Sequence, residues 1–166
     1  MVELKEFKEL LANAGPEEWK DIPDIDLYMD QVVSYMARQH IGLGQGGDEA
    51  LTSAMINNYI KHGLLPRAKG KRYSREHIGY LTVICLLKQV ISVTETGSLL
   101  QKEVESSSIE ELYRKYRDIV KKTFRSAADE IDPDADENAL LEQALTMAVS
   151  GYADILCCRK IIESLK

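Results

Sequence analysis

The sequence contains few of the residues that define fibrous, disordered or disulfide-rich chains. Its 166 residues include only 4 prolines, 10 glycines and 3 cysteines, whereas 45% are hydrophobic. These proportions exclude collagen-like and disordered chains and favour a globular protein. An odd number of cysteines, two of them adjacent, is typical of reduced thiols in a cytoplasmic protein.

The sequence also lacks a long apolar run. No stretch approaches the roughly 18 apolar residues of a membrane-spanning helix. Residues 1–6, which read Met-Val-Glu-Leu-Lys-Glu, lack the basic and apolar regions of a signal peptide. We therefore expect a soluble cytoplasmic protein that does not bind membranes.

Motifs of common catalytic and cofactor sites are missing as well, including the nucleophile elbow, the P-loop and the zinc-binding H-E-x-x-H. Residues 42–47 match G-x-G-x-x-G. The dinucleotide motif follows a strand, however, and here a helix is predicted before it. Residues 132–136 supply the D-x-D-x-D of a calcium loop without its later glycine and glutamate. We expect no enzymatic activity and no cofactor.

The cysteines do not form a metal-binding pattern. Cys157 and Cys158 are neighbours on a predicted helix, so their side chains point about 100° apart. No C-x-x-C spacing brings a second pair of thiols to the same ion. Cys85 falls in a strongly apolar helix and is expected to be a small core residue. The three histidines are dispersed, and we predict no metal site.

Positive charge is concentrated in one part of an acidic chain. The net charge is −6, yet residues 53–90 carry seven basic side chains against a single acid, Glu76. Such segregation favours either a local anionic partner or an internal partner of opposite sign. We call residues 53–90 the basic segment; its cations are Lys61, Arg67, Lys69, Lys71, Arg72, Arg75 and Lys88.

Apolar periodicity predicts helices along nearly the whole chain. A second helix is predicted from Ile25, with Asp24 as its N-cap. A tight basic hairpin is predicted around Gly70. The other predicted helices cover residues 4–14, 52–62, 75–91, 93–104 and 109–127, with a final helix after 132–137. The fold class is therefore all-α with one small β-hairpin.

The serines at 106–108 suggest a linker between two domains. The first domain, residues 1–104, would combine the N-terminal helix with a compact core over 22–100. The second, residues 109–166, would be a helical regulatory or dimerisation unit. The last helix has a broad apolar stripe, which makes it the best candidate for homodimer contact.

Residues 52–74 resemble the DNA-binding domain of MerR-type winged helix-turn-helix regulators. That family shows a helix ending in Tyr-x-x-x-Gly-Leu-Leu-Pro, a basic hairpin wing closing on Arg-x-Tyr-Ser, and an apolar helix. Tyr59 and residues 63–66 match the first part, residues 71–74 match the second, and the helix from Arg75 follows. Asn57-Asn58-Tyr59 stands where the family has Arg-Tyr-Tyr, so its arginine phosphate contact is not carried over.

Taken whole, the chain is similar to an uncharacterised bacterial protein family with this MerR-like winged domain. The resemblance is carried by residues 22–32 and 63–74 and extends over most of the chain. It brings no established activity with it.

The residues themselves suggest how such a domain would contact DNA. The helix at 52–62 would lie in the major groove, where asparagine pairs with adenine, and its N-terminus would hold a phosphate. The basic wing at 67–72 would contact backbone phosphates. The candidate DNA-binding residues are Thr52, Ser53, Asn57, Asn58, Lys61, Arg67, Lys69, Lys71, Arg72 and Arg75.

Two functional hypotheses follow. The first is a DNA-binding transcriptional regulator that acts on double-stranded DNA as a homodimer. The second is a protein–protein interaction module on a winged-helix scaffold, whose basic wing docks on an acidic surface without nucleic acid. Exposure of the basic segment favours the first, and ion pairing of that segment to residues 130–142 would favour the second.

Overall fold

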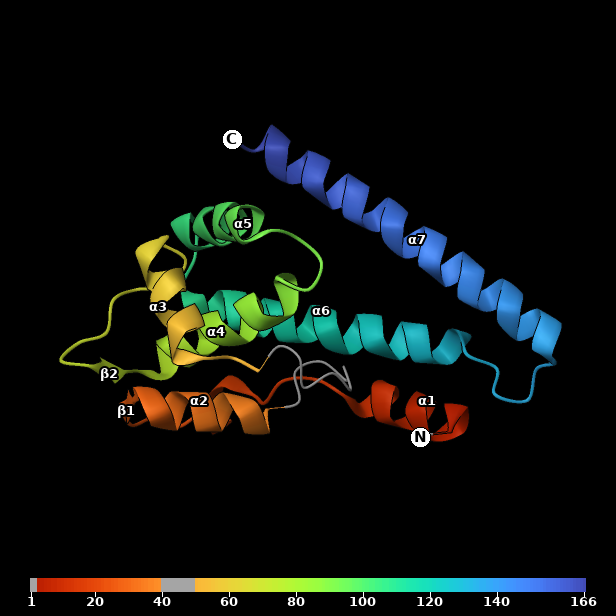
Figure 1. Ribbon diagram of the computed structural model, residues 1–166, viewed down its shortest axis with the longest axis horizontal. Helices are drawn as coiled ribbons and strands as arrows, with labels where there is room; N and C mark the ends of the chain where they lie inside the picture. The colour runs from red at the N-terminus through yellow and green to blue at the C-terminus, as the bar shows by residue number, and fades with distance from the viewer. Residues whose placement is uncertain (1–2, 40–49) are drawn as a thin grey trace. The chain divides into compact units, whose positions relative to one another are not determined.

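The computed structural model describes residues 3–39 and 50–166, most of which are helical (Figure 1). The helices are α1 (Leu4–Asn13), α2 (Met29–Arg38), α3 (Ser53–Lys61), α4 (Arg75–Leu87), α5 (Val93–Glu105), α6 (Ile109–Glu130) and α7 (Glu137–Ser164). A short 3-10 helix, η1 (Trp19–Asp21), and two strands, β1 (Leu27–Tyr28) and β2 (Arg72–Tyr73), complete the order. The all-α class with one small antiparallel sheet is confirmed. The glycine-rich segment 42–47 lies outside the described residues.

The chain divides into two compact units. One consists of Gly15–Ile119, and the other combines residues up to Ala14 with Val120–Lys166. Helix α6 contributes to both. The two domains expected from the sequence, with a linker at 106–108, remain a prediction.

Most helix ends lie where capping residues predict them. Thr52 caps α3, with its hydroxyl accepting a hydrogen bond from the Met55 amide at 3.2 Å, as expected of an N-cap threonine. Gly63 follows that helix with a φ of 76°, the left-handed conformation that glycine adopts at a helix end. Ser92 and Glu95 form a capping box at the start of α5.

The start of the second helix was predicted four residues too early. Helix α2 begins at Met29 and has Tyr28 as its N-cap, so Asp24 does not cap it. The reason is tertiary, because Leu27 and Tyr28 pair as a strand with residues far along the chain. Leu27 is opposite Tyr73 and Tyr28 is opposite Arg72.

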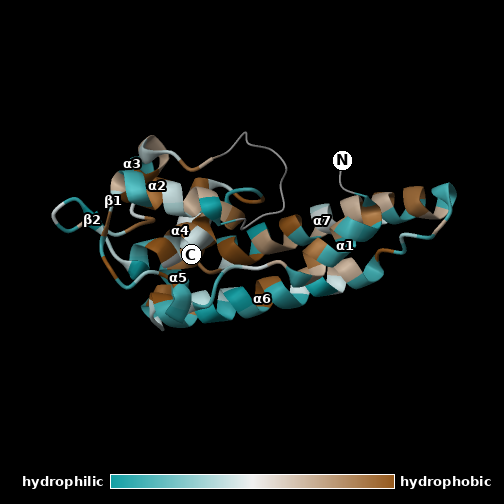
Figure 2. Cartoon of the chain, turned by 90° about the horizontal axis from the view of Figure 1, so that it is seen from below, coloured by the Kyte–Doolittle hydropathy of each residue, from teal (hydrophilic) through white to brown (hydrophobic). Residues whose placement is uncertain are grey.

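The apolar helix predicted at 75–91 is central to the unit Gly15–Ile119. Helix α4 buries residues on nearly every side, among them Ile78, Leu81, Val83 and Ile84. It ends at Leu87 rather than Ile91. Helix α6 is amphipathic instead, and Figure 2 shows one side of it teal and the other brown.

An aromatic cluster joins α4 to η1 and α6 within this unit. Trp19 and Tyr113 meet edge to face with their ring centroids 5.4 Å apart. The Tyr113 hydroxyl donates to the Glu17 carbonyl at 2.6 Å, and burial raises the pKa of Tyr113 to about 12. Gly79 lets the indole approach α4, since a Cβ there would lie 2.7 Å from Cζ3 of Trp19.

The other unit is held together by α1, the second half of α6 and α7. Lys8 of α1 donates from Nζ to the Ile131 carbonyl, which follows α6, at 2.7 Å. Val120, Ala128, Ile131 and Ile162 are buried. Asp136 caps α7 by accepting from the Ala139 amide at 2.9 Å. The acidic segment 132–137 therefore starts a helix, as carboxylates at helix N-termini do.

Replacing Gly79 with alanine should destabilise the unit Gly15–Ile119. The new methyl group would overlap the indole, so we expect the free energy of unfolding to fall by about 1–3 kcal/mol. Trp19 is the only tryptophan, so its fluorescence during denaturant unfolding reports on this cluster.

The matched control is Gly151→Ala in α7, where nothing lies within 4 Å of the added Cβ. Here alanine should stabilise the helix by about 0.5–1 kcal/mol, measured by circular dichroism. Equal stability of Gly79→Ala and the wild type would contradict the packing described for Trp19.

Candidate nucleic-acid interface

Helix α3 presents a polar face, as its sequence predicts. Ile56 and Tyr59 are buried at 0% and 3% exposure, which fixes the inward side of the helix. The candidate residues lie on the outward side, where Thr52, Ser53, Asn57, Asn58 and Lys61 are all exposed. These side chains are polar or charged, so this face of α3 can remain in contact with water.

The basic hairpin around Gly70 is a two-residue turn. Lys69 and Arg72 exchange both backbone hydrogen bonds, at 3.1 and 3.0 Å. Gly70 and Lys71 between them have φ angles of 57° and 63°. Two successive positive φ angles are typical of the type I′ turn that connects tight hairpins. We call residues 67–72 the basic turn.

Strand β2, which begins at Arg72, pairs with β1 as well as with Lys69 across the turn. The sheet therefore joins the basic turn to the start of α2, 44 residues earlier for Tyr28 and Arg72. Among the described residues, the hairpin itself has a single backbone pairing, between Lys69 and Arg72. The wing expected from the sequence is thus a turn anchored by a distant strand.

Arg72 is held by Tyr28. Its Nη2 donates to the Tyr28 hydroxyl at 3.2 Å, and its guanidinium carbon lies 5.4 Å from the centroid of the Tyr28 ring. Such a cation–π contact orients the guanidinium without neutralising it. Sequence analysis missed Tyr28, because only the strand pairing brings it beside the basic turn.

Arg75 has a structural role. Its side chain is only 23% exposed and lies 3.9 Å from the Asp24 carboxylate, and its Nε donates to the Ile22 carbonyl at 3.1 Å. It therefore fixes the segment before β1 onto the start of α4. We leave it out of the contact surface, although the sequence suggested it.

His77 holds the basic turn against α4 through its two ring nitrogens. Its Nδ1 accepts a hydrogen bond from the Ser74 amide at 3.0 Å, so its Nε2 carries the proton. Nε2 then donates to the carbonyl of Pro66 at 3.1 Å or that of Arg67 at 3.3 Å. This buried histidine joins the start of the basic turn to the N-terminus of α4, and its sequence context contained no signal of that role.

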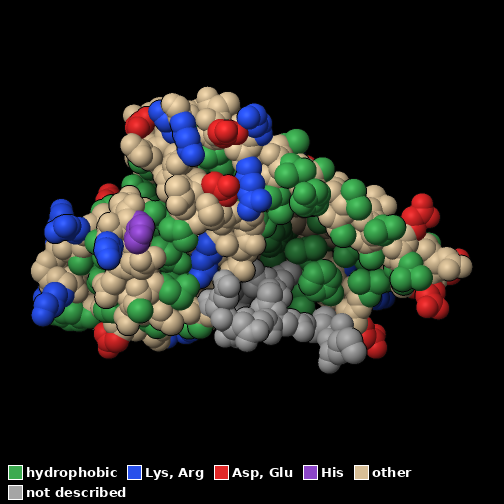
Figure 3. All heavy atoms as spheres, turned by 45° about the horizontal axis from the view of Figure 1, so that its top comes forward, with side chains coloured by type: hydrophobic (Ala, Val, Ile, Leu, Met, Phe, Trp, Pro, Cys, Tyr) green, Lys and Arg blue, Asp and Glu red, His purple; other side chains and the backbone are tan. Residues whose placement is uncertain are grey.

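Besides Arg72, four of the predicted cations are exposed and have no acidic partner among the described residues. Within residues 3–39 and 50–166, no carboxylate lies at ion-pair distance from any of them. Figure 3 shows blue side chains gathered at the left end of the molecule, where Figure 1 places α3 and β2. These cations are Lys61, Arg67, Lys69 and Lys71.

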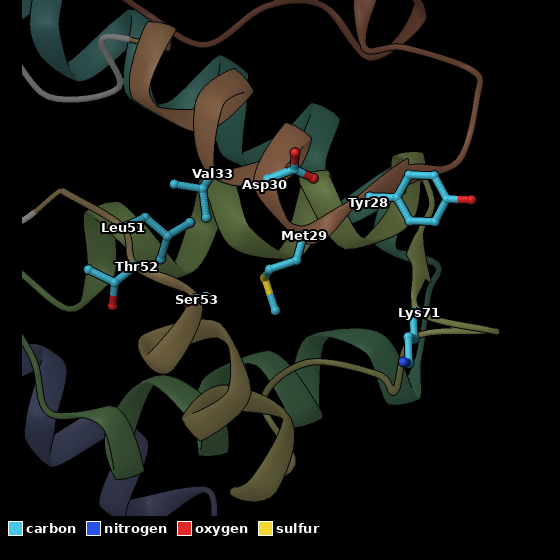
Figure 4. Close-up of a pocket in the computed structure, with 8 residues that line it drawn as sticks. All are labelled: Tyr28, Met29, Asp30, Val33, Leu51, Thr52, Ser53 and Lys71. Atoms are coloured by element: carbon cyan, nitrogen blue, oxygen red, sulfur yellow. The ribbon is translucent and has the colours of Figure 1, made fainter.

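An open groove lies between the beginnings of α2 and α3 (Figure 4). Met29, Val33 and Leu51 give it an apolar floor, and Thr52 and Ser53 bring the N-terminus of α3 to its edge. Lys71 and Asp30 supply one charge of each sign. The groove thus connects the polar face of α3 to the basic turn.

The part of the chain that the structure describes contains no group of three His, Cys, Asp or Glu side chains placed to hold an ion. None of its helices combines the length and apolarity that a membrane crossing needs. Cys85, Cys157 and Cys158 are all free thiols.

Cys85 is half-buried on α4 rather than a fully buried core residue, and its thiol should react slowly in the folded protein. Burial raises the pKa of its thiol to about 11, so only about one molecule in a thousand carries the reactive thiolate at pH 8. In the variant Cys157→Ser/Cys158→Ser, the remaining thiol of the folded protein should react with a disulfide reagent far more slowly than glutathione, and it should reach the rate of a free thiol only after denaturant is added. Reaction of the folded variant at the rate of a free thiol would contradict the packing of Cys85 in α4.

Comparison with known proteins identifies a family but no characterised relative. Searches of curated proteins and of solved structures found no match. The family described as "Domain of unknown function (DUF1836)" matches residues 17–116. This span includes β1, α3, the basic turn and α4, so it covers the whole candidate interface. Because the match covers more than half of the sequence, the chain belongs to the DUF1836 family.

Proposed function

We propose that this protein binds double-stranded DNA and acts as a transcriptional regulator. Helix α3 would lie in the major groove, and the basic turn would contact the phosphate backbone, as in the MerR-type winged domains that the sequence resembles. The observation that carries the proposal is the exposure, on neighbouring elements, of a polar helix face and of four cations that have no acidic partner within residues 3–39 and 50–166.

The charge distribution supports an anionic partner of this kind. A net charge of −6 opposes binding to a polyanion over the whole surface. The exposed cations Lys61, Arg67, Lys69 and Lys71, with Arg72 held on Tyr28, form a local exception. Phosphate contacts of this type supply affinity and position but no sequence information.

The first turn of α3 offers a second kind of phosphate contact. The Thr52 hydroxyl accepts a hydrogen bond from the Met55 amide. The backbone amides that precede Met55 in the first turn point out of the helix N-terminus, and such amides attract anions. Further along the same face, Asn57 and Asn58 have the donor and acceptor pair that reads adenine in the major groove. The face thus combines candidate contacts to phosphates with candidate contacts to base edges.

The backbone of Lys71 gives independent support. Lys71 is the only non-glycine residue with a positive φ among the described residues. That conformation costs an L-residue about 1–2 kcal/mol relative to glycine, and strain of this kind concentrates at functional sites. A lysine where glycine would be more stable is explained if its charge is needed at the tip of the turn.

A protein partner is the alternative, and the groove between α2 and α3 favours it. Its apolar floor of Met29, Val33 and Leu51 offers hydrophobic burial that a phosphate backbone does not use. An acidic protein segment could then lie along the groove and end at Lys71. The salt dependence of binding to DNA distinguishes the two proposals.

Binding to a mixed-sequence DNA duplex should weaken steeply as salt increases. Five cations in contact with phosphates would give a slope of log affinity against log salt of about −4 to −5. Fluorescence anisotropy of a labelled duplex measures it. Absence of binding by the folded protein at low salt would reject DNA as the partner and leave the protein–protein proposal.

Replacing Lys71 with glycine separates charge from folding. Glycine relieves the positive φ, so the free energy of unfolding should stay equal or rise by about 1 kcal/mol. DNA affinity should nevertheless fall roughly tenfold, and the salt slope should become shallower by about 0.9.

The matched control is Lys102→Ala on α5, a lysine that pairs with Glu105 at 3.6 Å outside the candidate interface. It removes the same charge and should leave affinity and slope unchanged. Equal binding by the Lys71→Gly variant and the wild type would exclude the basic turn from the interface.

Asn57→Ala should change which sequences are preferred. Loss of a bidentate contact to adenine removes about 1–3 kcal/mol of discrimination at one base pair, while the affinity for mixed-sequence DNA stays constant. Selection from a randomised duplex library measures the preference. The control is Thr94→Ala, at an exposed position on α5. If the wild type and both variants select the same sequences, Asn57 does not recognise a base.

A further inference from the structure

Helix α7 has apolar residues on two different sides. One side packs within its own unit, where Ile162 is 4% exposed and Leu140, Met147, Ile155 and Cys158 are half-buried. The other side carries five large apolar side chains with 47–67% exposure. We call these five residues the α7 stripe: Leu141, Leu145, Val149, Tyr152 and Leu156.

The α7 stripe is continuous and narrow. At about 100° per residue, its five members fall within about 80° of the helix circumference. It lies well away from the packed side, so the residues that hold α7 in its unit are not the residues that form the stripe. Figure 3 shows green hydrophobic side chains at the surface on the right of the view, where Figure 1 places α7.

The exposed area is that of an interface. If a large side chain presents roughly 200 Å² when fully exposed, the five members expose on the order of 600 Å². Contiguous apolar patches larger than a few hundred Å² are rare on monomers. Two such stripes would together bury on the order of 1,200 Å², which reaches the size of specific protein interfaces.

The stripe is self-complementary about its midpoint, between Ala148 and Val149. Leu141 and Leu156 are equally far from this point, and so are Leu145 and Tyr152. Two antiparallel copies would therefore pair Leu141 with Leu156 and Leu145 with Tyr152 at both ends. The small Ala148, also exposed, would let the helices approach at the centre. An interface between identical copies requires this kind of symmetry.

The charges of α7 favour the antiparallel direction. Glu137 and Glu142 lie in its first half, which has no basic residue. Arg159 and Lys160, its only basic residues, lie in the second half together with Asp154 and Glu163, and Lys160 pairs with Glu163 at 2.9 Å. Parallel packing would place each charge beside its own copy. Antiparallel packing in the register above brings Glu137 of each copy to the level of Arg159 and Lys160 of the other, which is electrostatically complementary.

We infer that a second copy of this chain covers the α7 stripe, with the two α7 helices packed antiparallel. This inference rests on α7 alone and does not depend on the proposed DNA binding. It supplies the geometry for the homodimer expected from the sequence.

The test is the mass of the full chain in solution, measured by light scattering between about 1 and 100 µM, the range in which micromolar complexes dissociate. The chain has a mass of 18.7 kDa, and we expect twice that value for the wild type. Leu145→Asp/Tyr152→Asp should halve the measured mass, with an unchanged circular dichroism spectrum. A wild-type monomer at the highest concentration would overturn the inference, and so would a double variant that remains dimeric.

Ile161→Asp is the matched control. Ile161 is also on α7 and 60% exposed, but it lies about 160° around the helix from the centre of the stripe. It introduces the same kind of charge and should leave the dimer intact. Dissociation by this variant as well would show that any charge on α7 disrupts the protein and would overturn the assignment to the stripe.

Cysteine crosslinking tests the direction without relying on a disruptive variant. In the Cys157→Ser/Cys158→Ser background, Leu141→Cys combined with Leu156→Cys should form a disulfide-linked dimer on oxidation, whereas Leu141→Cys alone should not. Crosslinking of the single variant would indicate parallel helices and overturn the antiparallel arrangement. Absence of any crosslink, together with a monomeric mass, would overturn the inference.

Discussion

The arrangement of the candidate interface depends on the pairing of Leu27 and Tyr28 with Tyr73 and Arg72. This sheet has only two residues in each strand, yet it joins the start of α2 to the end of the basic turn. The turn itself contains one backbone pairing, between Lys69 and Arg72, and an isolated hairpin of that size is not stable in water. The distant strand therefore gives the exposed cations a fixed place on the protein.

Uncharged or buried groups hold the charged ones in position. Tyr28 orients Arg72 through its hydroxyl and its ring, and His77 joins the start of the turn to the N-terminus of α4. Neither residue neutralises a cation, so the positive charge of the turn remains available to a partner. Arg75 shows the opposite arrangement, since it is paired with Asp24 and the Ile22 carbonyl and serves the fold.

The two proposals concern different units of the chain. The proposed DNA-binding surface belongs to Gly15–Ile119, which contains the whole DUF1836 match. Dimer formation is argued from α7, beyond the matched residues 17–116. Because each proposal has its own residues and its own measurement, the failure of one leaves the other intact. If both hold, the family domain supplies recognition and the C-terminal helix supplies the symmetry that paired half-sites require.

The sequence by itself determined most of the helices, because the interactions that start and end a helix are local. Thr52, Gly63 and Asp136 act on the backbone within one turn of their own positions, so caps and breaks are readable residue by residue. The outward face of α3 and the tight turn at Gly70 follow from period and composition in the same way. Tertiary structure alone decided that α2 starts at Met29, that Tyr28 meets Arg72 and that Arg75 pairs with Asp24 and the Ile22 carbonyl. Each of these depends on contacts between residues more than 40 positions apart, and no local pattern encodes which distant partner a strand or a guanidinium will find.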